Sequence, residues 1–445
     1  MSKKFSIIIK NRLKNFNQIL NIAPDKSITH RAFILASQCQ GISRIRGLQS
    51  EDIAATRNSL KSLGVKILKK KDKYFVFGNG IGSLRKLKHT IDCQNSGSTA
   101  RMIGGLICTC RFSIRMTGDA SLRKRPMGRV IKYINKIGAA VVGAKNKFNL
   151  PLVIQGTNYP LAQKHILDVP SAQVKSAIMF SALNTPGTTE IVEKYDTRDH
   201  TEILLKNLNA PIKIKKIGKK RLISLKGQCE MQAFDINVPG DPSSACFFIV
   251  QTLCMKNSKI LLKNICVNHN RIGFIEILNK MGARIKILNQ KKVNGEKVGD
   301  IFVKSRKLRN ISVSKKIIPR TIDELTSLFL ISAISTGKAT YVNLSELALK
   351  ESNRIFEIQK GLHLMGIKTK ATKDSLAIYG NPNLKIKRNI KIFAHLDHRI
   401  CMGFFILGQA LGIDMTIKGF ESVNSSFPNF LKLQKKLGAK YEIKK

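Results

Sequence analysis

Charged and polar residues stand at the openings of several strongly apolar segments of this sequence. They occur there beside serine, threonine, asparagine and aspartate, the residue types that commonly cap a helix. The positive end of a helix dipole and its unpaired N–H groups favour anions. Because buried helices seldom begin with so much charge, the openings predict sites for anionic groups. The residues concerned are Lys26, Arg31, Arg101, Gln173, Lys175, Asp323 and Arg399.

These openings belong to one of two helix types that alternate along the chain. The first type begins at a polar opening and continues as a strongly apolar helix, as in DKSITHRAFILAS and LDHRICMGFFILG. The second type is amphipathic and ends near a glycine, or once an asparagine, before a strand-like run. The ending residues recur at intervals of roughly 70 to 85 positions, which predicts six repeated α/β units. They are Gly64, Gly138, Asn209, Gly282, Gly366 and Gly438.

The composition is that of an ordinary globular protein with a large positive charge. The chain has 445 residues, of which 43% are hydrophobic, and no apolar run approaches the length of a membrane span. The N-terminus lacks the features of a signal peptide, so we expect a cytoplasmic protein with no membrane partner. The nine cysteines are scattered singly, apart from Cys108 and Cys110. Because no second pair stands at zinc spacing, these two residues do not predict a metal site.

The formal net charge of +50 permits a second interpretation, a nucleic-acid-binding protein. The lysines are spread over the whole length, however, and the chain has no tryptophan and only 6% aromatic residues that could stack on bases. We therefore interpret the charge as compositional bias on solvated faces, which would still attract small anions. No nucleic acid is expected as a partner.

Ten sequence blocks in a fixed order resemble the 5-enolpyruvylshikimate-3-phosphate synthase family. They extend over nearly the whole chain, and together they are far more specific than any one tetrapeptide. The blocks are DKSITHRA, NSGSTAR, DASLRKRPMGRV, SAQVKSA, RDHTE, VPGDPSSA, IDEL, LKESNR, HLDHRI and SFPNF.

The resemblance implies an α/β fold of two similar domains, each made of three βαβαββ-type units, an inside-out α/β barrel. The active site is expected in the interdomain cleft. The first domain would comprise residues 23–240, and the second residues 1–22 plus 241–445, because the N-terminal strand belongs with the second half. Gly240, beside Pro239, suits a hinge at the second crossing.

The family transfers the enolpyruvyl group of phosphoenolpyruvate to the 5-hydroxyl of shikimate 3-phosphate. The products are 5-enolpyruvylshikimate 3-phosphate and phosphate, formed by addition and elimination on the route to chorismate and the aromatic amino acids. The resemblance implies Asp323 as base, Glu351 as acid and Lys26 as a cation that can relay a proton. It implies no metal and no organic cofactor.

Both substrates are dianionic or more, so their sites call for several cations, and arginine meets carboxylates and phosphates bidentately. For phosphoenolpyruvate the resemblance implies Lys26, Gly97, Arg125, Gln173, Arg354 and Arg399. For shikimate 3-phosphate it implies Lys26, Ser27, Arg31, Ser171, Ala172, Gln173, Arg198, Asp323 and Lys350. Pro126, after Arg125, is expected at the first position of a helix.

Several positions depart from the family pattern. Pro24 replaces a glycine before Lys26, Asn353 replaces an aspartate, and Ser425 stands where some relatives carry a lysine that touches phosphoenolpyruvate. Several blocks look most like the subgroup tolerant of glyphosate, a herbicide that occupies the phosphoenolpyruvate site in this family. Tolerant members carry alanine where this chain keeps Gly97, so we expect inhibition competitive with phosphoenolpyruvate.

Two alternatives remain besides nucleic-acid binding. The first is the related enolpyruvyl transferase that acts on a UDP-sugar, against which DKSITHR and the pair Ser171 and Gln173 argue. The second is an inactive relative, against which the retained Lys26 and the complete set of expected arginines and carboxylates argue. One transferase accounts for the whole length, and we expect a monomer.

Overall fold

The computed structural model describes residues 4–143, 148–386 and 389–445, and the chain divides into two compact units. The central unit comprises Pro24–Val238 together with the short segment Val293–Glu296. The terminal unit comprises the chain up to Ala23, Pro239–Lys292 and Lys297–Lys445. Two of the crossings lie close to the boundaries expected at residues 23 and 240. The excursion at Val293–Glu296 was not expected.

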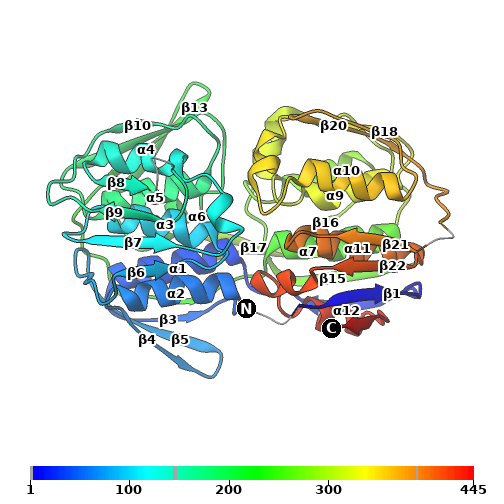
Figure 1. Cartoon of the computed structure of the whole chain (residues 1–445), viewed down its shortest axis with the longest axis horizontal. Helices are drawn as coiled ribbons and strands as arrows, with labels where there is room; N and C mark the ends of the chain where they lie inside the picture. Colours follow the sequence, from blue (N-terminus) through cyan, green and yellow to red (C-terminus); the bar gives the residue numbers. More distant parts are fainter. Residues whose placement is uncertain (1–3, 144–147, 387–388) are drawn as a thin grey trace. The chain divides into compact units, whose positions relative to one another are not determined.

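The described part of the central unit contains three four-stranded sheets with one common strand order (Figure 1). In each, a short edge strand pairs in parallel with the second strand, and the remaining pairs are antiparallel. The first sheet is β14 (Asp235–Asn237), β3 (Gln40–Arg46), β5 (Lys73–Asn79) and β4 (Lys66–Lys70). The second is β6 (Thr90–Asp92), β7 (Ser113–Thr117), β9 (Leu152–Gln155) and β8 (Ala140–Gly143). The third is β10 (Lys164–Ile166), β11 (Thr188–Glu193), β13 (Lys220–Lys226) and β12 (Ile212–Ile217).

The described part of the terminal unit repeats this arrangement. The first sheet is β2 (Asn17–Asn21), β15 (Lys259–Cys266), β17 (Glu296–Lys304) and β16 (Lys286–Val293). The middle sheet is β18 (Gly337–Val342), β20 (Ser375–Gly380) and β19 (Thr369–Ala371). The last sheet is β21 (Ile390–Phe393), β22 (Met415–Lys418), β1 (Ser6–Ile9) and β23 (Glu442–Lys444). In the middle sheet the parallel edge strand is reduced to isolated bridges, such as Ser312 with Thr340. The six repeats expected from the sequence are therefore confirmed.

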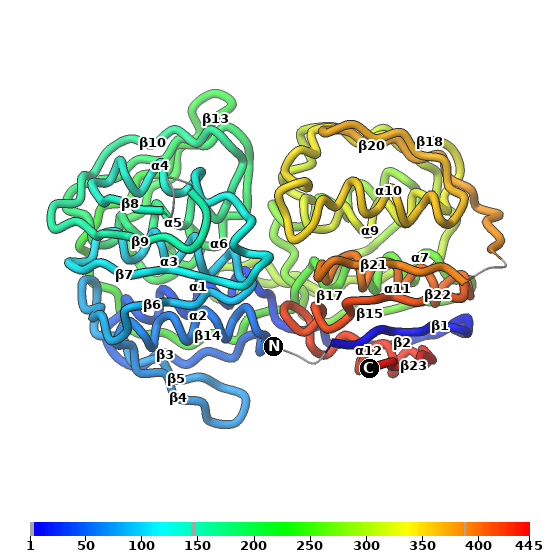
Figure 2. The backbone as a smooth tube through the Cα atoms, in the orientation of Figure 1, coloured from blue at the N-terminus to red at the C-terminus, as the bar shows by residue number. Residues whose placement is uncertain are grey.

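Chain ends complete the terminal unit. β1 pairs with β22 and β23, and β2 pairs in parallel with β15, so the N-terminal strands do belong with the second half of the chain (Figure 2).

The two helix types are also confirmed. The apolar helices are buried, and in the terminal unit all three pack on one another. They are α1 (Lys26–Gln38), α3 (Gly97–Ile107), α5 (Ala172–Leu183), α7 (Pro242–Cys254), α9 (Leu325–Ala333) and α11 (His398–Leu411). Side chains of Asp25, Ser96, Ser171, Asp241 and Asp397 cap five of them by accepting a backbone N–H bond.

The amphipathic helices all end at a left-handed residue. They are α2 (Glu51–Ser62), α4 (Gly128–Ile137), α6 (His200–Asn207), α8 (Gly273–Lys280), α10 (Arg354–Leu364) and α12 (Phe430–Lys436). The six predicted ending residues all have positive φ, from 55° at Asn209 to 108° at Gly138. Asparagine tolerates this conformation better than other non-glycine residues, which explains the one exception to glycine.

Glycine at the last strand of several repeats allows close contact with the end of the buried helix. A Cβ at Gly156 would lie 1.9 Å from the carbonyl oxygen of Cys110, and one at Gly227 would lie 1.9 Å from that of Thr185. Gly380 has the same relation to Ser335, also at 1.9 Å. No side chain fits at such distances, so the sheet and helix can pack this closely only through glycine.

We expect Gly156→Ala to destabilise the central unit by at least the roughly 1–3 kcal/mol typical of overpacking, because backbone atoms cannot move aside as a flexible side chain can. The measurement is urea unfolding of the variant against the native chain. Gly128→Ala is the matched control, since its nearest atom beyond the helix would be Phe148 Cβ at 3.7 Å. Equal stability of the two variants would contradict this packing argument.

The glycine expected as a hinge is held rather than free. Gly240 N–H donates to the carbonyl of Asn264 at 2.8 Å, and its own carbonyl accepts from Cys266 N–H at 2.9 Å. A Cβ at Gly240 would lie 2.7 Å from Ile265 Cδ1. The residue is thus needed for close approach to β15, and the hinge at this crossing stays a prediction.

No helix in the described ranges is long and apolar enough to cross a membrane.

Candidate active site

The opening of α1 presents a lysine beside a carboxylate. Asp25 caps the helix by accepting the Ile28 N–H at 2.8 Å, which leaves Lys26 at the first helical position. The Lys26 ammonium lies 2.8 Å from Asp52 Oδ2, and both side chains remain partly accessible, at 18% and 11%. Asp52 sits in the first turn of α2, so the two helix openings together hold this cation.

Arg31 joins α1 to α5 and to the start of α6. Its Nη1 donates to the Ser27 carbonyl at 2.9 Å, and its Nη2 donates to Ser176 Oγ at 2.8 Å. Its Nε donates to Thr201 Oγ1 at 2.8 Å. Arg198, three residues before Thr201, donates from Nη1 to Ser27 Oγ at 3.3 Å. Three of the residues expected to bind the acceptor therefore meet here.

The openings of α3 and α5 meet at Gln173. Its Nε2 donates to Ser98 Oγ at 2.8 Å, and its Oε1 accepts from Arg101 Nη1 at 2.7 Å. Ser171 caps α5, and the carbonyl of Ala172 at the first helical position accepts from Arg31 Nη2 at 3.4 Å. The amide of Gln173 is thereby fixed in orientation.

Arg125 and Gly97 lie together at the opening of α3. Arg125 is buried and donates from Nη2 to Asn95 Oδ1 at 2.6 Å. A Cβ on Gly97 would lie 2.8 Å from Arg101 Nη1 and 3.4 Å from Arg125 Nη1. Pro126 does not begin the following helix, because α4 starts at Gly128 with Met127 as its N-cap. That expectation was wrong by two residues, while the grouping of Gly97 with Arg125 is observed.

The terminal unit gathers three cations around Asp323. Lys350 Nζ lies 3.5 Å from Asp323 Oδ1, and Arg354 Nη1 lies 3.8 Å from the same oxygen. Arg399 Nη2 lies 3.7 Å from Oδ2, and its Nη1 donates to the Asp323 carbonyl at 2.8 Å. Asp323 lies just before α9 in a turn, and its side chain keeps 14% of its surface accessible.

Arg354 links both candidate catalytic carboxylates to a buried aspartate. Its Nε and Nη2 donate to the two oxygens of Asp397 at 2.8 and 3.2 Å, a bidentate pair. Nη2 also donates to Glu351 Oε2. Burial opposes the charge of the guanidinium, but Asp397, Glu351 and Asp323 outweigh it and raise the pKa of Arg354 above its usual value. Arg354 is therefore a permanent cation.

Asp397 also holds the second arginine. It caps α11 by accepting the Arg399 N–H at 3.0 Å, and Ser352 Oγ donates to its other oxygen at 2.9 Å. This one carboxylate, fully excluded from solvent, therefore contacts two of the three arginines expected to meet phosphoenolpyruvate.

Two of the departures from the family pattern have a clear structural role. Asn353 caps α10 by accepting the Phe356 N–H at 3.3 Å, which an aspartate would also do. Ser425 is buried and donates to the Ser422 carbonyl at 2.7 Å, so a short polar side chain fits this turn.

The predicted residues thus fall into two sets. Lys26, Ser27, Arg31, Gly97, Arg125, Ser171, Ala172, Gln173 and Arg198 belong to the central unit, and Asp323, Lys350, Glu351, Arg354 and Arg399 to the terminal unit. Asp52 and Asp397 were not predicted from the sequence. Asp397 stood within the HLDHRI block, whereas Asp52 resembles an ordinary acidic residue in a first helical turn.

Each set combines several fixed cations with few accessible carboxylates. Such an arrangement can bind phosphate and carboxylate groups and leave a base in place to accept a proton.

Known proteins resemble this chain over nearly its full length. The family model for EPSP synthase (3-phosphoshikimate 1-carboxyvinyltransferase) matches residues 10–433. A 3-phosphoshikimate 1-carboxyvinyltransferase of Zymomonas mobilis is 38% identical over 429 residues, which cover 95% of this chain and 94% of that protein. One of Thermodesulfovibrio yellowstonii is 40% identical over 415 residues, covering 92% and 94%. The solved structure of EPSP synthase from Acinetobacter baumannii matches the whole of both chains with a TM-score of 0.84 and 34% identity. The repeats, the two charged sets and these matches agree, and the chain belongs to the EPSP synthase family.

Proposed function

We propose that this chain transfers the enolpyruvyl group of phosphoenolpyruvate to the 5-hydroxyl of shikimate 3-phosphate. The observation that carries the proposal is the cluster in which Arg354 touches Glu351 and lies near Asp323, with Lys350 and Arg399 alongside. It combines two carboxylates, proposed as base and acid, with three cations, which suits a reaction between two anions. The relatives named above carry the same activity in their names.

In the addition step, the Asp323 carboxylate accepts the proton of the 5-hydroxyl while the oxygen attacks C2 of phosphoenolpyruvate. Glu351 gives a proton to C3, and the double bond becomes a tetrahedral ketal. Lys26, Arg125, Arg354 and Arg399 stabilise the phosphate and carboxylate charges through both states.

In the elimination step, the bond from C2 to the phosphate oxygen breaks. Glu351 takes back a proton from C3, and the enol ether forms. The released phosphate carries away the bonding electron pair, and the proton held by Asp323 returns to solvent or phosphate. Neither step changes the oxidation state of a substrate.

The acceptor site in this proposal consists of Ser27, Arg31, Arg198 and the opening of α5, with Lys350 and Asp323 from the terminal unit. Hydroxyl, amide and guanidinium donors match a phosphorylated ring with several hydroxyls. We further propose that the protein acts as a monomer in the cytoplasm.

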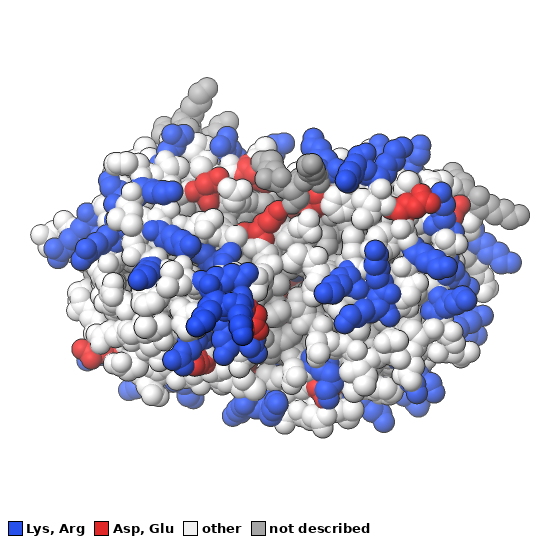
Figure 3. Space-filling model, turned by 90° about the horizontal axis from the view of Figure 1, so that it is seen from below, with Lys and Arg blue, Asp and Glu red and all other residues white. Residues whose placement is uncertain are grey.

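On the face drawn in Figure 3, lysine and arginine side chains occur in several separate groups, which supports the compositional explanation of the charge.

Release of inorganic phosphate tests the proposal. We expect phosphate only when phosphoenolpyruvate and shikimate 3-phosphate are both present, and none with either alone. Release with a UDP-sugar in place of shikimate 3-phosphate would favour the related transferase. Retention on duplex nucleic acid above roughly 0.2 M salt, without phosphate release, would favour the nucleic-acid interpretation.

Gly97→Ala is expected to weaken inhibition by glyphosate relative to the binding of phosphoenolpyruvate. The added methyl would approach two guanidinium groups, at 2.8 and 3.4 Å, and crowding of this kind typically costs about 1–3 kcal/mol, or roughly 5- to 150-fold in affinity. The measurement compares inhibition constants of the two forms at varied phosphoenolpyruvate. A native enzyme that is already tolerant, or an unchanged inhibition constant, would contradict this expectation.

A further inference from the structure

Lys175 is a charged residue at a helix opening that the proposed reaction does not use. It lies in the first turn of α5 and is fully buried, so it cannot touch a substrate. The sequence predicted a bound anion at this helix opening, but the anions found beside Lys175 are two carboxylates of the protein itself. The Lys175 ammonium lies 3.0 Å from both oxygens of Glu193 and 2.7 Å from Glu202 Oε1.

The two carboxylates stand at the two ends of one loop. Glu193 is the last residue of β11, and Glu202 is in the first turn of α6. The loop between β11 and α6 comprises residues 194–199, which include Arg198. A single buried cation therefore joins both ends of the loop that carries the arginine expected to hold the acceptor phosphate.

Glu193 also fixes the loop from inside. It accepts the Thr197 N–H at 3.1 Å and the Thr197 hydroxyl, directly before Arg198. Arg221 on β13 lies 3.5 Å from its other oxygen. The backbone at Arg198 is thus set by a carboxylate whose own position depends on Lys175.

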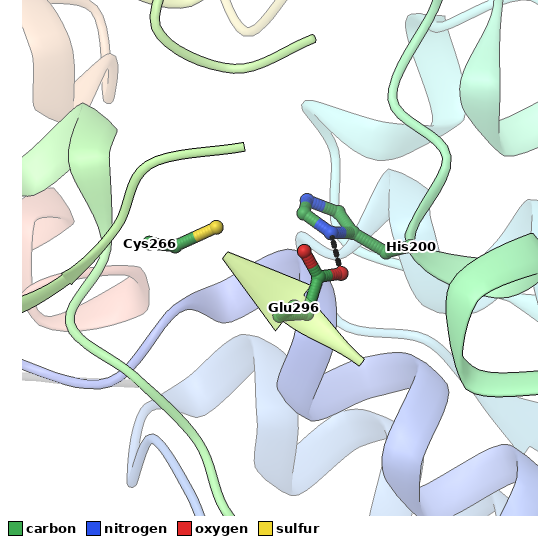
Figure 4. Close-up of side chains that lie close together, drawn as sticks. All are labelled: His200, Cys266 and Glu296. Carbon is green, nitrogen blue, oxygen red and sulfur yellow. Dashed lines mark hydrogen bonds and ion pairs between the residues drawn. The ribbon is translucent and has the colours of Figure 1, made fainter. Parts of the chain in front are cut away.

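The start of α6 is held a second time, by the tip of the β16–β17 hairpin. His200 Nδ1 lies 2.5 Å from Glu296 Oε1, and both side chains are buried (Figure 4, which also draws Cys266 of the terminal unit). A Cβ at Gly295 would approach Ile203 Cγ2 at 2.9 Å, so the tip fits closely against α6. Because these contacts hold the start of α6 in place, we expect loss of the Lys175 contacts to displace mainly the loop at residues 194–199.

Removal of the ammonium would leave two buried carboxylates facing each other. Burial already raises the pKa of Glu202, and Lys175 opposes that rise. Without the cation, one carboxylate must take up a proton or move toward water, and either change releases an end of the loop.

We infer that Lys175, through Glu193 and Glu202, is a positioning residue for Arg198 and thereby sets the affinity for the phosphate of the acceptor. This inference rests on the proposed function. It differs from a general stabilising role because it concerns only one of the two substrates.

The test is steady-state kinetics of Lys175→Met with each substrate varied. We expect KM for shikimate 3-phosphate to rise about 10- to 100-fold, as small misplacements of a binding group do. KM for phosphoenolpyruvate should stay within about 2-fold, since its expected residues lie outside this network. Lys206→Met, on the exposed side of α6, removes the same charge without touching the network and controls for the general positive field.

Glu202→Gln provides a second reading if Lys175→Met does not fold. It should raise KM for shikimate 3-phosphate but not for phosphoenolpyruvate. The variant that combines Lys175→Met with Glu202→Gln should be less impaired than Lys175→Met, because it has one buried carboxylate fewer. Equal rises in both KM values, or an unchanged acceptor KM in the folded variants, would overturn the inference. Phosphate release by the native chain is measured first. If the native chain releases no phosphate, the proposed function is contradicted, and not the role of Lys175.

Discussion

Asp323→Asn is expected to lower kcat by about 10²–10⁴ while leaving both KM values nearly unchanged or lower. The substitution keeps the size of the side chain but removes its capacity to accept a proton, and loss of a positioned base typically has an effect of this size. The neighbouring Lys350, Arg354 and Arg399 would lose a competing carboxylate, so their attraction for substrate anions should not fall. Steady-state kinetics with both substrates measures the two quantities separately.

Asp414→Asn is the matched control for this prediction, because Asp414 is exposed in the same unit. It should behave like the native chain. Glu351→Gln should resemble Asp323→Asn, since the acid is as necessary as the base. Near-normal kcat in both active-site variants would show that the two roles are assigned to the wrong residues.

Arg354→Met is expected to abolish measurable turnover and to lower the free energy of unfolding of the terminal unit by about 3–5 kcal/mol. The guanidinium and Asp397 form a bidentate pair that is almost wholly buried, and removal of one partner leaves the other charge uncompensated. Glu351 would lose its ion pair with Arg354, and phosphoenolpyruvate one of its expected cations. Urea unfolding and phosphate release measure the two effects.

Two further variants separate stability from activity at this position. Arg354→Met combined with Asp397→Asn should recover part of the stability, because the fully buried aspartate charge is then also absent, but no activity. Arg354→Lys should keep the charge but lose the bidentate geometry, and so retain little turnover. Recovery of activity in the double variant would exclude a direct role for Arg354 in the reaction.

Local chemistry made much of the site predictable. Lys26, Gln173 and Arg399 stand at openings of apolar helices, where charged or polar side chains are unexpected unless they bind something, and all three are found at helix openings with polar partners. Lys175 also stands at a helix opening, but its charge is matched by Glu193 and Glu202 instead of a substrate. Those two carboxylates lie 18 and 27 positions away in sequence, so nothing local indicated that they would enclose it.

The sequence by itself determined the six repeats, the two helix types and the residues that end each helix, because these depend on periodicity, capping and the left-handed conformation of glycine and asparagine. Only the tertiary structure decided which charges meet. The partners of Lys26, Arg354 and Lys175 come from other elements, and the choice among 78 basic and 28 acidic residues depends on packing rather than on spacing. The hairpin tip at Val293–Glu296 illustrates the same limit. Asn294 and Gly295 indicate a tight turn, but its place beside His200 follows from a buried hydrogen bond between residues 96 positions apart.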